Sequence, residues 1–164
     1  MTAAIPADLE SSPLFAPLAG RPELVELAHA CELHRATAGE VVVSEGTEGD
    51  TMYVIIRGRV RVEKRTPSHD TYTVTFLEAG SFFGEVALFS RDRRSATCVA
   101  ESECDFVVIS RERFEAFGDR YAQAGLLLTR RIASHLAARL LSANDDIITL
   151  FSALVEEIEG SVLR

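Results

Sequence analysis

The sequence is poor in features that would mark it as secreted or membrane-bound. It contains no run of about 18 apolar residues, and its N-terminal stretch has neither a basic start nor an apolar core typical of a secretion signal. We therefore expect no membrane-spanning segment and predict a cytoplasmic location. The three cysteines, Cys31, Cys98 and Cys104, form no CxxC pair, which favours a reducing compartment.

Positive charge is also scarce. The chain has 25 acidic against 17 basic residues and a formal net charge of -8, so its overall field repels nucleic acids and anionic lipids. We expect neither a nucleic-acid partner nor a membrane partner. Arg57, Arg59 and Arg61 alternate with aliphatic residues and predict a basic face along one strand. That face could bind a polyanion, but we favour a solvated outer face because no aromatic residues are interleaved.

Signatures of catalysis and of metal binding are missing as well. The sequence has no GxxxxGK[ST], GxSxG or HExxH motif, and its polar residues assemble into no catalytic constellation. His29, Cys31 and His34 have a spacing that loosely resembles metal ligands, but no second ligand pair follows. A structural role is favoured for these three residues. We predict no enzyme activity, no metal and no cofactor.

What is present indicates one folded domain of the α+β class, mainly β. The 164 residues are 47% hydrophobic and 26% charged, enough to bury a core. Residues 7–30 have helical spacing, and residues 32–110 form short β-branched runs separated by glycines. This pattern predicts an antiparallel β-roll, or jelly-roll barrel, with N-terminal helices. The strand-like runs are residues 40–46, 51–58, 59–65, 71–80, 96–101 and 104–110.

Helical spacing returns after Ser110, with a short helix over residues 111–121 and a long C-terminal helix from Ala122. Apolar residues then recur in steps of three and four, as in a coiled coil: Ala133, Leu136, Leu140, Ala143, Ile147, Leu150 and Leu154. Packing on its own domain explains the first turns, whereas a second copy is favoured beyond about residue 143. We predict an N-terminal extension (1–13), a domain (14–142) and a coiled-coil tail (143–164) that forms a homodimer.

The densest chemical signal is the run FGEVALFSRDRRSAT at residues 83–97. Gly84 permits close backbone approach, and Glu85 supplies a carboxylate that can only accept hydrogen bonds. The next four residues can form one helical turn whose N–H groups face an anion, and Arg94 adds a bidentate donor. Donors that can bind an anion, next to a carboxylate that can accept a hydrogen bond from a hydroxyl, suit a sugar phosphate. The alternative is a buried Glu85–Arg94 ion pair without a ligand.

This run resembles the phosphate-binding cassette of cyclic nucleotide-binding domains. The resemblance extends to the stretch 38–62 and the turn 78–85, and it covers about residues 14–142. It implies that Glu85 binds the ribose 2′-hydroxyl and Arg94 the exocyclic phosphate oxygens. The other implied phosphate contacts are Gly84, Val86, Ala87, Ser95 and Ala96, while Arg91 and Arg93 are expected to face solvent.

The base side of the implied pocket is less well defined. Val62 and Val74 match positions that line it, although both are also ordinary core valines by pattern. A lid residue is expected on the long helix, where Arg139 is the first candidate and Leu140, Ser142 and Asn144 are alternatives. Because Ser95 fits both cAMP-binding and cGMP-binding relatives, the resemblance leaves the choice of purine open.

The resemblance implies a stand-alone regulatory protein rather than an enzyme. It would sense cAMP or cGMP and relay occupancy through its C-terminal helix to an unknown protein effector. Activators of this family continue into a helix-turn-helix domain that binds DNA, and we expect none here because the chain reaches Arg164 soon after the lid. The alternative is a degenerate, ligand-free scaffold that mediates protein–protein interaction.

Overall fold

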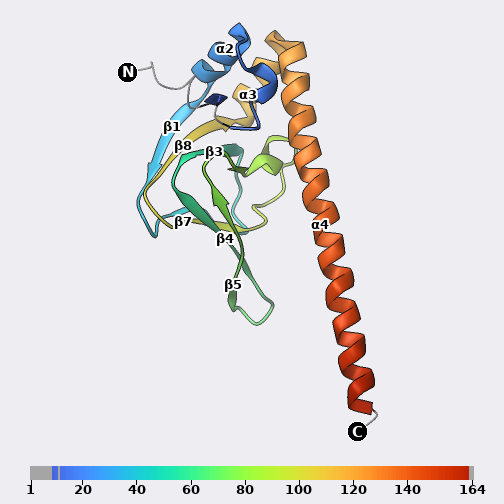
Figure 1. Ribbon diagram of the computed structural model, residues 1–164. Helices are drawn as coiled ribbons and strands as arrows, with labels where there is room; N and C mark the ends of the chain where they lie inside the picture. Colours follow the sequence, from blue (N-terminus) through green and yellow to red (C-terminus); the bar gives the residue numbers. More distant parts are fainter. Residues whose placement is uncertain (1–8, 11, 163–164) are drawn as a thin grey trace. The chain divides into compact units, whose positions relative to one another are not determined.

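The computed structural model describes residues 9–10 and 12–162, and it divides the chain into two compact units, Met1–Leu128 and Thr129–Arg164 (Figure 1). The first unit contains all the strands and the short helices, and the second is the remainder of one long helix. The elements in chain order are η1 (Ala16–Leu18), α2 (Pro22–Ala30), β1 (Glu32–Ala36), β2 (Val41–Val43), β3 (Thr51–Arg57), β4 (Arg59–Arg65), β5 (Thr71–Glu78), β6 (Phe82–Phe83), η2 (Glu85–Leu88), β7 (Thr97–Ala100), β8 (Cys104–Ser110), α3 (Arg111–Arg120) and α4 (Ala122–Val162).

The strands form two four-stranded antiparallel sheets, with the orders β1-β8-β3-β6 and β2-β7-β4-β5. This confirms the predicted antiparallel roll with a long C-terminal helix. The sequence pattern does not single out β1 and β6. Four of the five residues of β1 are exposed, so it shows no alternation of apolar and polar residues, and β6 contains only two residues.

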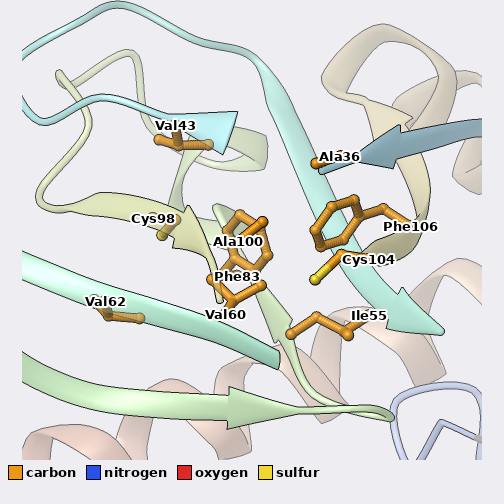
Figure 2. Packing of buried hydrophobic residues seen from close by; sticks show 10 residues of the cluster. All are labelled: Ala36, Val43, Ile55, Val60, Val62, Phe83, Cys98, Ala100, Cys104 and Phe106. Carbon is orange, nitrogen blue, oxygen red and sulfur yellow. The ribbon is translucent and has the colours of Figure 1, made fainter. Parts of the chain in front are cut away.

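The core of the roll lies between the two sheets, as Figure 2 shows. Phe106 on β8 and Ile55 on β3 are completely buried, and each such side chain contributes about 1.5–3 kcal/mol when removed from water. Both sheets supply the cluster, so neither can form its buried face without the other. Its members are Ala36, Val43, Ile55, Val60, Val62, Phe83, Cys98, Ala100, Cys104 and Phe106.

The chain turns between β3 and β4 at Gly58, whose φ is 96°. A Cβ atom at this position would lie 2.4 Å from the carbonyl oxygen of Glu103 and 2.6 Å from Sγ of Cys104. Only glycine fits there. The prediction that Arg57, Arg59 and Arg61 share one face of one strand is therefore wrong, because Arg57 belongs to β3 and the other two to β4.

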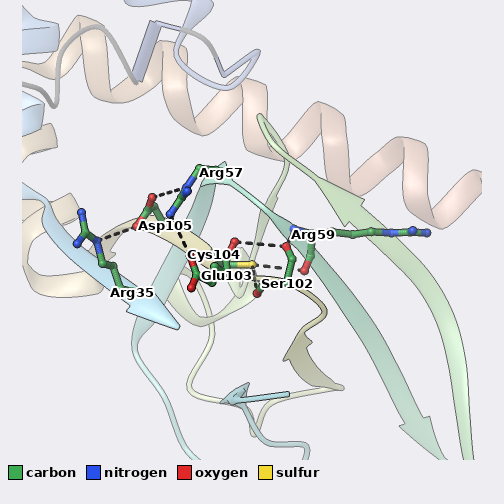
Figure 3. Close-up of polar contacts among 7 residues, drawn as sticks. All are labelled: Arg35, Arg57, Arg59, Ser102, Glu103, Cys104 and Asp105. Carbon is green, nitrogen blue, oxygen red and sulfur yellow. Dashed lines mark hydrogen bonds and ion pairs between the residues drawn. The ribbon is translucent and has the colours of Figure 1, made fainter. Parts of the chain in front are cut away.

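Carboxylates neutralise these arginines. Asp105 accepts from Nε of Arg57 at 2.8 Å and from Nε of Arg35 at 2.9 Å (Figure 3). Arg59 lies 3.1 Å from Glu78 and also stacks on the ring of Phe76. Arg61, the third arginine, is paired with Glu63 and Glu101. The arginines therefore belong to local ion pairs, which agrees with the favoured interpretation of a solvated face.

The helical segment predicted at residues 7–30 is interrupted. Leu9 and Glu10 are helical, and residues 12–15 form a bend and a turn before η1. The helix α2 then begins with Pro22 at its first position, where the missing N–H costs nothing. The buried hydroxyl of Ser12 donates to the carbonyl of Gly80 at 2.7 Å, which ties this end of the chain to the turn after β5. Most of the predicted extension 1–13 lies outside the described residues.

The long C-terminal helix is present as α4, which is continuous over Ala122–Val162. The domain boundary predicted at residue 142 falls inside it and stays a prediction. Of the predicted heptad residues, Leu140, Ile147, Leu150 and Leu154 have exposed fractions of 57–65%. No helix in the described part of the chain is long and apolar enough to cross a membrane.

Candidate functional site

The cassette joins the two sheets, since it leaves β6 in the first sheet and enters β7 in the second. It opens with Gly84 in the left-handed conformation, with a φ of 75°. A Cβ atom there would lie 2.7 Å from Nη1 of Arg94 and 2.9 Å from the carbonyl oxygen of Thr51. Glycine is therefore needed both for the turn and for the close approach of β3 and Arg94.

The predicted helical turn follows directly as η2, a single 3-10 turn. Glu85 is only 2% exposed, whereas Val86 is 43% exposed. Arg111 at the start of α3 anchors the turn by donating from Nε to the carbonyl of Ala87 at 2.8 Å and from Nη2 to the carbonyl of Ser90. The turn therefore combines a buried carboxylate with a backbone that is held in place by Arg111 of α3.

The guanidinium of Arg94 is held by β3 and by the start of the cassette. Nη1 donates to the carbonyl oxygen of Thr51 at 2.8 Å and to that of Gly84 at 3.3 Å. Nη2 donates to the hydroxyl of Thr51 at 3.0 Å. A guanidinium has five N–H donors in a fixed fork. These three bonds leave the Nε hydrogen and one Nη2 hydrogen along one edge, the parallel pair that matches two phosphate oxygens.

Gly49 lies beside that same edge of Arg94. A Cβ atom on residue 49 would lie 2.3 Å from Nε and 2.5 Å from Nη2, so any side chain would occupy the space next to the two donors. Gly49 and Thr51 were not among the predicted site residues. Nothing in their local pattern distinguishes them, because both are separated from Arg94 by more than 40 residues and the contact arises only in the fold.

Ser95 and Ala96 follow Arg94, and Lys64 on β4 orients the peptide between them. Its Nζ donates to the carbonyl of Ser95 at 2.7 Å and lies 3.5 Å from the carboxylate of Glu45. In a trans peptide the C=O and the following N–H point in opposite directions, so this bond also fixes the direction of the Ala96 N–H. The backbone N–H of Arg65 donates to Glu45 and lowers the pKa of that carboxyl group.

The residues predicted for the base side lie on two neighbouring strands. Val62 on β4 is 5% exposed and belongs to the core, whereas Val74 on β5 is 62% exposed. The alternative that both are ordinary core valines is therefore wrong for Val74, because β5 is an edge strand whose side chains are largely exposed. Arg139 lies on α4 in the second unit, as do the alternative lid residues Leu140, Ser142 and Asn144.

The two other cassette arginines are exposed, as expected. Arg93 donates to the carbonyl of Gly46 at 2.7 Å. Arg91 borders a cavity of about 430 Å³ whose other described lining residues are Glu48, Gly49, Asp50 and Arg111. Two carboxylates there balance two guanidinium groups, which makes this cavity a poor match for a free anion.

The three residues with metal-like spacing are divided between two elements. His29 lies in α2, Cys31 caps its end, and His34 lies on β1. The ring of His34 is 6.0 Å from that of Phe106, with the two planes inclined by 25°. Burial raises the pKa of Cys31 to about 12. Within the described residues, no three His, Cys, Asp or Glu side chains come together in a way that could hold a metal ion.

Comparison with known proteins adds independent evidence. Residues 33–121 match the family model described as "Cyclic nucleotide-binding domain". The chain is 35% identical over 94 residues to cGMP-dependent protein kinase 2 of Homo sapiens, covering 56% of this chain and 12% of the kinase. It is 29% identical over 107 residues to the cAMP-activated global transcriptional regulator CRP of Haemophilus influenzae, covering 65% and 48%. The chain thus spans less than half of either relative.

A solved structure agrees with this match over more of the chain. The cyclic nucleotide-binding domain from Methylobacillus flagellatus superposes with a TM-score of 0.75 at 27% identity, and the alignment covers 88% of this chain and 80% of that one.

Proposed function

Because this chain belongs to the cyclic nucleotide-binding domain family, we propose that it is a regulatory protein without enzymatic activity that binds cAMP or cGMP in its cassette. The observation that carries the proposal is the guanidinium of Arg94, which is held by hydrogen bonds to Thr51 and whose Nε edge lies beside Gly49, where any side chain would clash with it. Two parallel N–H groups on a positive charge suit the two exocyclic oxygens of a cyclic phosphate. We also propose that the protein acts in the cytoplasm.

In this proposal Glu85 binds the ribose. A 3′,5′-cyclic nucleotide has one free ribose hydroxyl, at the 2′ position, and a carboxylate is an acceptor that requires such a donor. A 2′-deoxy analogue lacks this donor and should therefore bind more weakly. The backbone N–H groups of η2 and of Ser95 and Ala96 would complete the phosphate contacts, with Val62 and Val74 on the base side.

Isothermal titration with cAMP, cGMP and their 2′-deoxy forms tests this proposal. We expect binding of at least one cyclic nucleotide that is lost in Arg94→Ala and strongly weakened in Glu85→Gln. Arg91→Ala is the matched control, since it removes a neighbouring exposed arginine. The same titration decides between the two purines, because one relative is named as cGMP-dependent and the other as cAMP-activated.

The ligand-free scaffold makes the opposite prediction. A ligand that binds only the native state must raise the melting temperature. At a hundredfold excess over Kd it adds about 2.7 kcal/mol to the free energy of unfolding. If millimolar cAMP and cGMP both leave the melting temperature of the wild-type protein unchanged, the sensor role is refuted and the scaffold role is favoured.

We further propose that the second unit pairs with a second copy and passes ligand occupancy to a protein effector. The exposed apolar side chains of Ile147, Leu150 and Leu154 follow the alternating four- and three-residue steps of a coiled-coil seam. Single helices of this kind are stabilised by a partner that covers the apolar stripe. A ligand would act through any difference in affinity between two arrangements of the paired helices.

Sedimentation equilibrium tests the pairing. Wild-type protein should be dimeric at micromolar concentration and Leu150→Asp monomeric, because the substitution places a charge in the seam. Ser152→Asp, two residues away and off the stripe, should remain dimeric. A monomeric wild-type protein would exclude a stable homodimer.

A further inference from the structure

One residue at the start of β3 accepts hydrogen bonds from both terminal nitrogens of Arg94. This residue is Thr51, whose carbonyl oxygen accepts from Nη1 at 2.8 Å and whose hydroxyl accepts from Nη2 at 3.0 Å. These two bonds engage the Nη1/Nη2 edge in the way a bidentate acceptor would. With that edge engaged, the guanidinium presents its Nε/Nη2 edge elsewhere.

The Thr51 hydroxyl has a second polar neighbour besides Arg94. Its one hydrogen can be directed to the Tyr53 hydroxyl, a long contact at 3.4 Å. The Tyr53 ring stacks on Phe83 with the ring centroids 5.1 Å apart and the planes within 4° of parallel. Because Phe83 immediately precedes Gly84, the same strand pair fixes Tyr53 and the start of the cassette. A lone pair of Thr51 is thereby free to accept from Arg94.

The chemistry of residue 51 also preserves the charge of Arg94. The acceptors supplied by Thr51 and by Gly84 are neutral oxygens, which orient a guanidinium without cancelling its positive charge. A carboxylate in place of the hydroxyl would form an ion pair with Arg94 and compete with an incoming phosphate.

We propose that Thr51 is a positioning residue for anion binding, which fixes the rotation of the Arg94 guanidinium so that its Nε/Nη2 edge receives the phosphate. The proposal rests on the proposed function for the identity of the anion. Its positioning step concerns contacts within the protein alone, so it can be tested with and without a ligand.

The first test measures the Arg94 guanidinium in the absence of a nucleotide. ¹⁵N relaxation of the Arg94 Nε–H group should show a restricted side chain in the wild-type protein and in Thr51→Ser, which keeps the hydroxyl. In Thr51→Val, which has nearly the same shape without the hydroxyl, the group should become more mobile, because only the Nη1 bonds to two backbone carbonyls remain. An equally restricted Nε–H group in Thr51→Val would overturn the proposal whether or not the protein binds nucleotides.

The second test is the affinity for cAMP and cGMP by isothermal titration. Thr51→Val should weaken binding about 10-fold or more, the scale of one charge-assisted hydrogen bond, and Thr51→Ser should restore it to within about threefold of wild type. In an Arg94→Lys background the valine substitution should cost nothing further, because lysine has no fork to orient. Wild-type affinity in Thr51→Val refutes the positioning role, whereas no binding by the wild type refutes the nucleotide proposal and leaves the relaxation result to decide on Thr51.

Discussion

Replacement of Gly49 by alanine should abolish most nucleotide binding while leaving the fold intact. Gly49 has no left-handed φ, so alanine fits its backbone conformation. The nearest atoms to the new methyl group are all at the end of the Arg94 side chain, with Nε at 2.3 Å and Cζ at 2.6 Å. Non-bonded heavy atoms prefer separations of about 3.5–4.0 Å, so the guanidinium must retreat by about 1 Å or more.

The expected magnitude follows from the bonds that this retreat breaks. A shift of about 1 Å moves Arg94 out of hydrogen-bond range of Thr51 and out of register with a phosphate bound at its Nε edge. One charge-assisted hydrogen bond is worth about 1.5–3 kcal/mol, which corresponds to a loss of affinity of about 10- to 100-fold. The free energy of unfolding should also fall, by about 1–3 kcal/mol, because the same displacement breaks hydrogen bonds from Arg94 to Thr51.

Isothermal titration and urea unfolding of the same preparation separate the two effects. Gly118→Ala in α3 is the matched control, since a Cβ atom there meets nothing within 4 Å. It should keep wild-type affinity and gain about 0.5–1 kcal/mol of stability from the better helix former. A folded Gly49→Ala variant with wild-type affinity would show that the Nε edge of Arg94 is not the phosphate contact.

Three further predictions follow from other parts of the roll. Gly58→Ala should lower the free energy of unfolding by more than about 2 kcal/mol in urea titrations, because its φ is positive and Glu103 leaves no room for a methyl group. Lys64→Met, which keeps the apolar stem but not the donor to Ser95, should weaken nucleotide binding several-fold at an unchanged melting temperature. Since burial raises the pKa of Cys31 to about 12, the native state keeps its thiol proton above pH ~8.5, where the unfolded state loses it. Stability should therefore be full below that pH and fall by about 1.4 kcal/mol per pH unit up to about pH 12, and Cys31→Ala should remove this dependence in urea titrations at several pH values.

The strands and the cassette could be predicted because their signals are local. Alternating apolar residues between glycines identified most strands of the roll, and the segment from Gly84 to Phe89 contains in sequence both the turn residue and the carboxylate that shape η2. Pro22 at the first position of α2 is likewise a local signal, because proline favours the start of a helix. In these segments the residues that determine the conformation are neighbours in the chain.

The remaining features depend on contacts between distant segments. Thr51 and Gly49 gain their roles only when β3 meets Arg94 across the fold. The residue pattern of its strand predicts that Val74 is buried in the core. Val74 is exposed instead, because β5 lies at the edge of its sheet. The turn at Gly58 similarly depends on the carbonyl of Glu103, which the local sequence does not reveal.

The crossing of the cassette from β6 to β7 has a consequence for how the site assembles. Each end of the segment is held by a different sheet, and Thr51, which orients its arginine, comes from a third strand. The cassette therefore acquires its shape only when the entire roll has folded. A synthetic peptide copying residues 82–97 would contain the carboxylate and the guanidinium but not their arrangement, and destabilised variants should lose their ligand and their tertiary structure in a single transition.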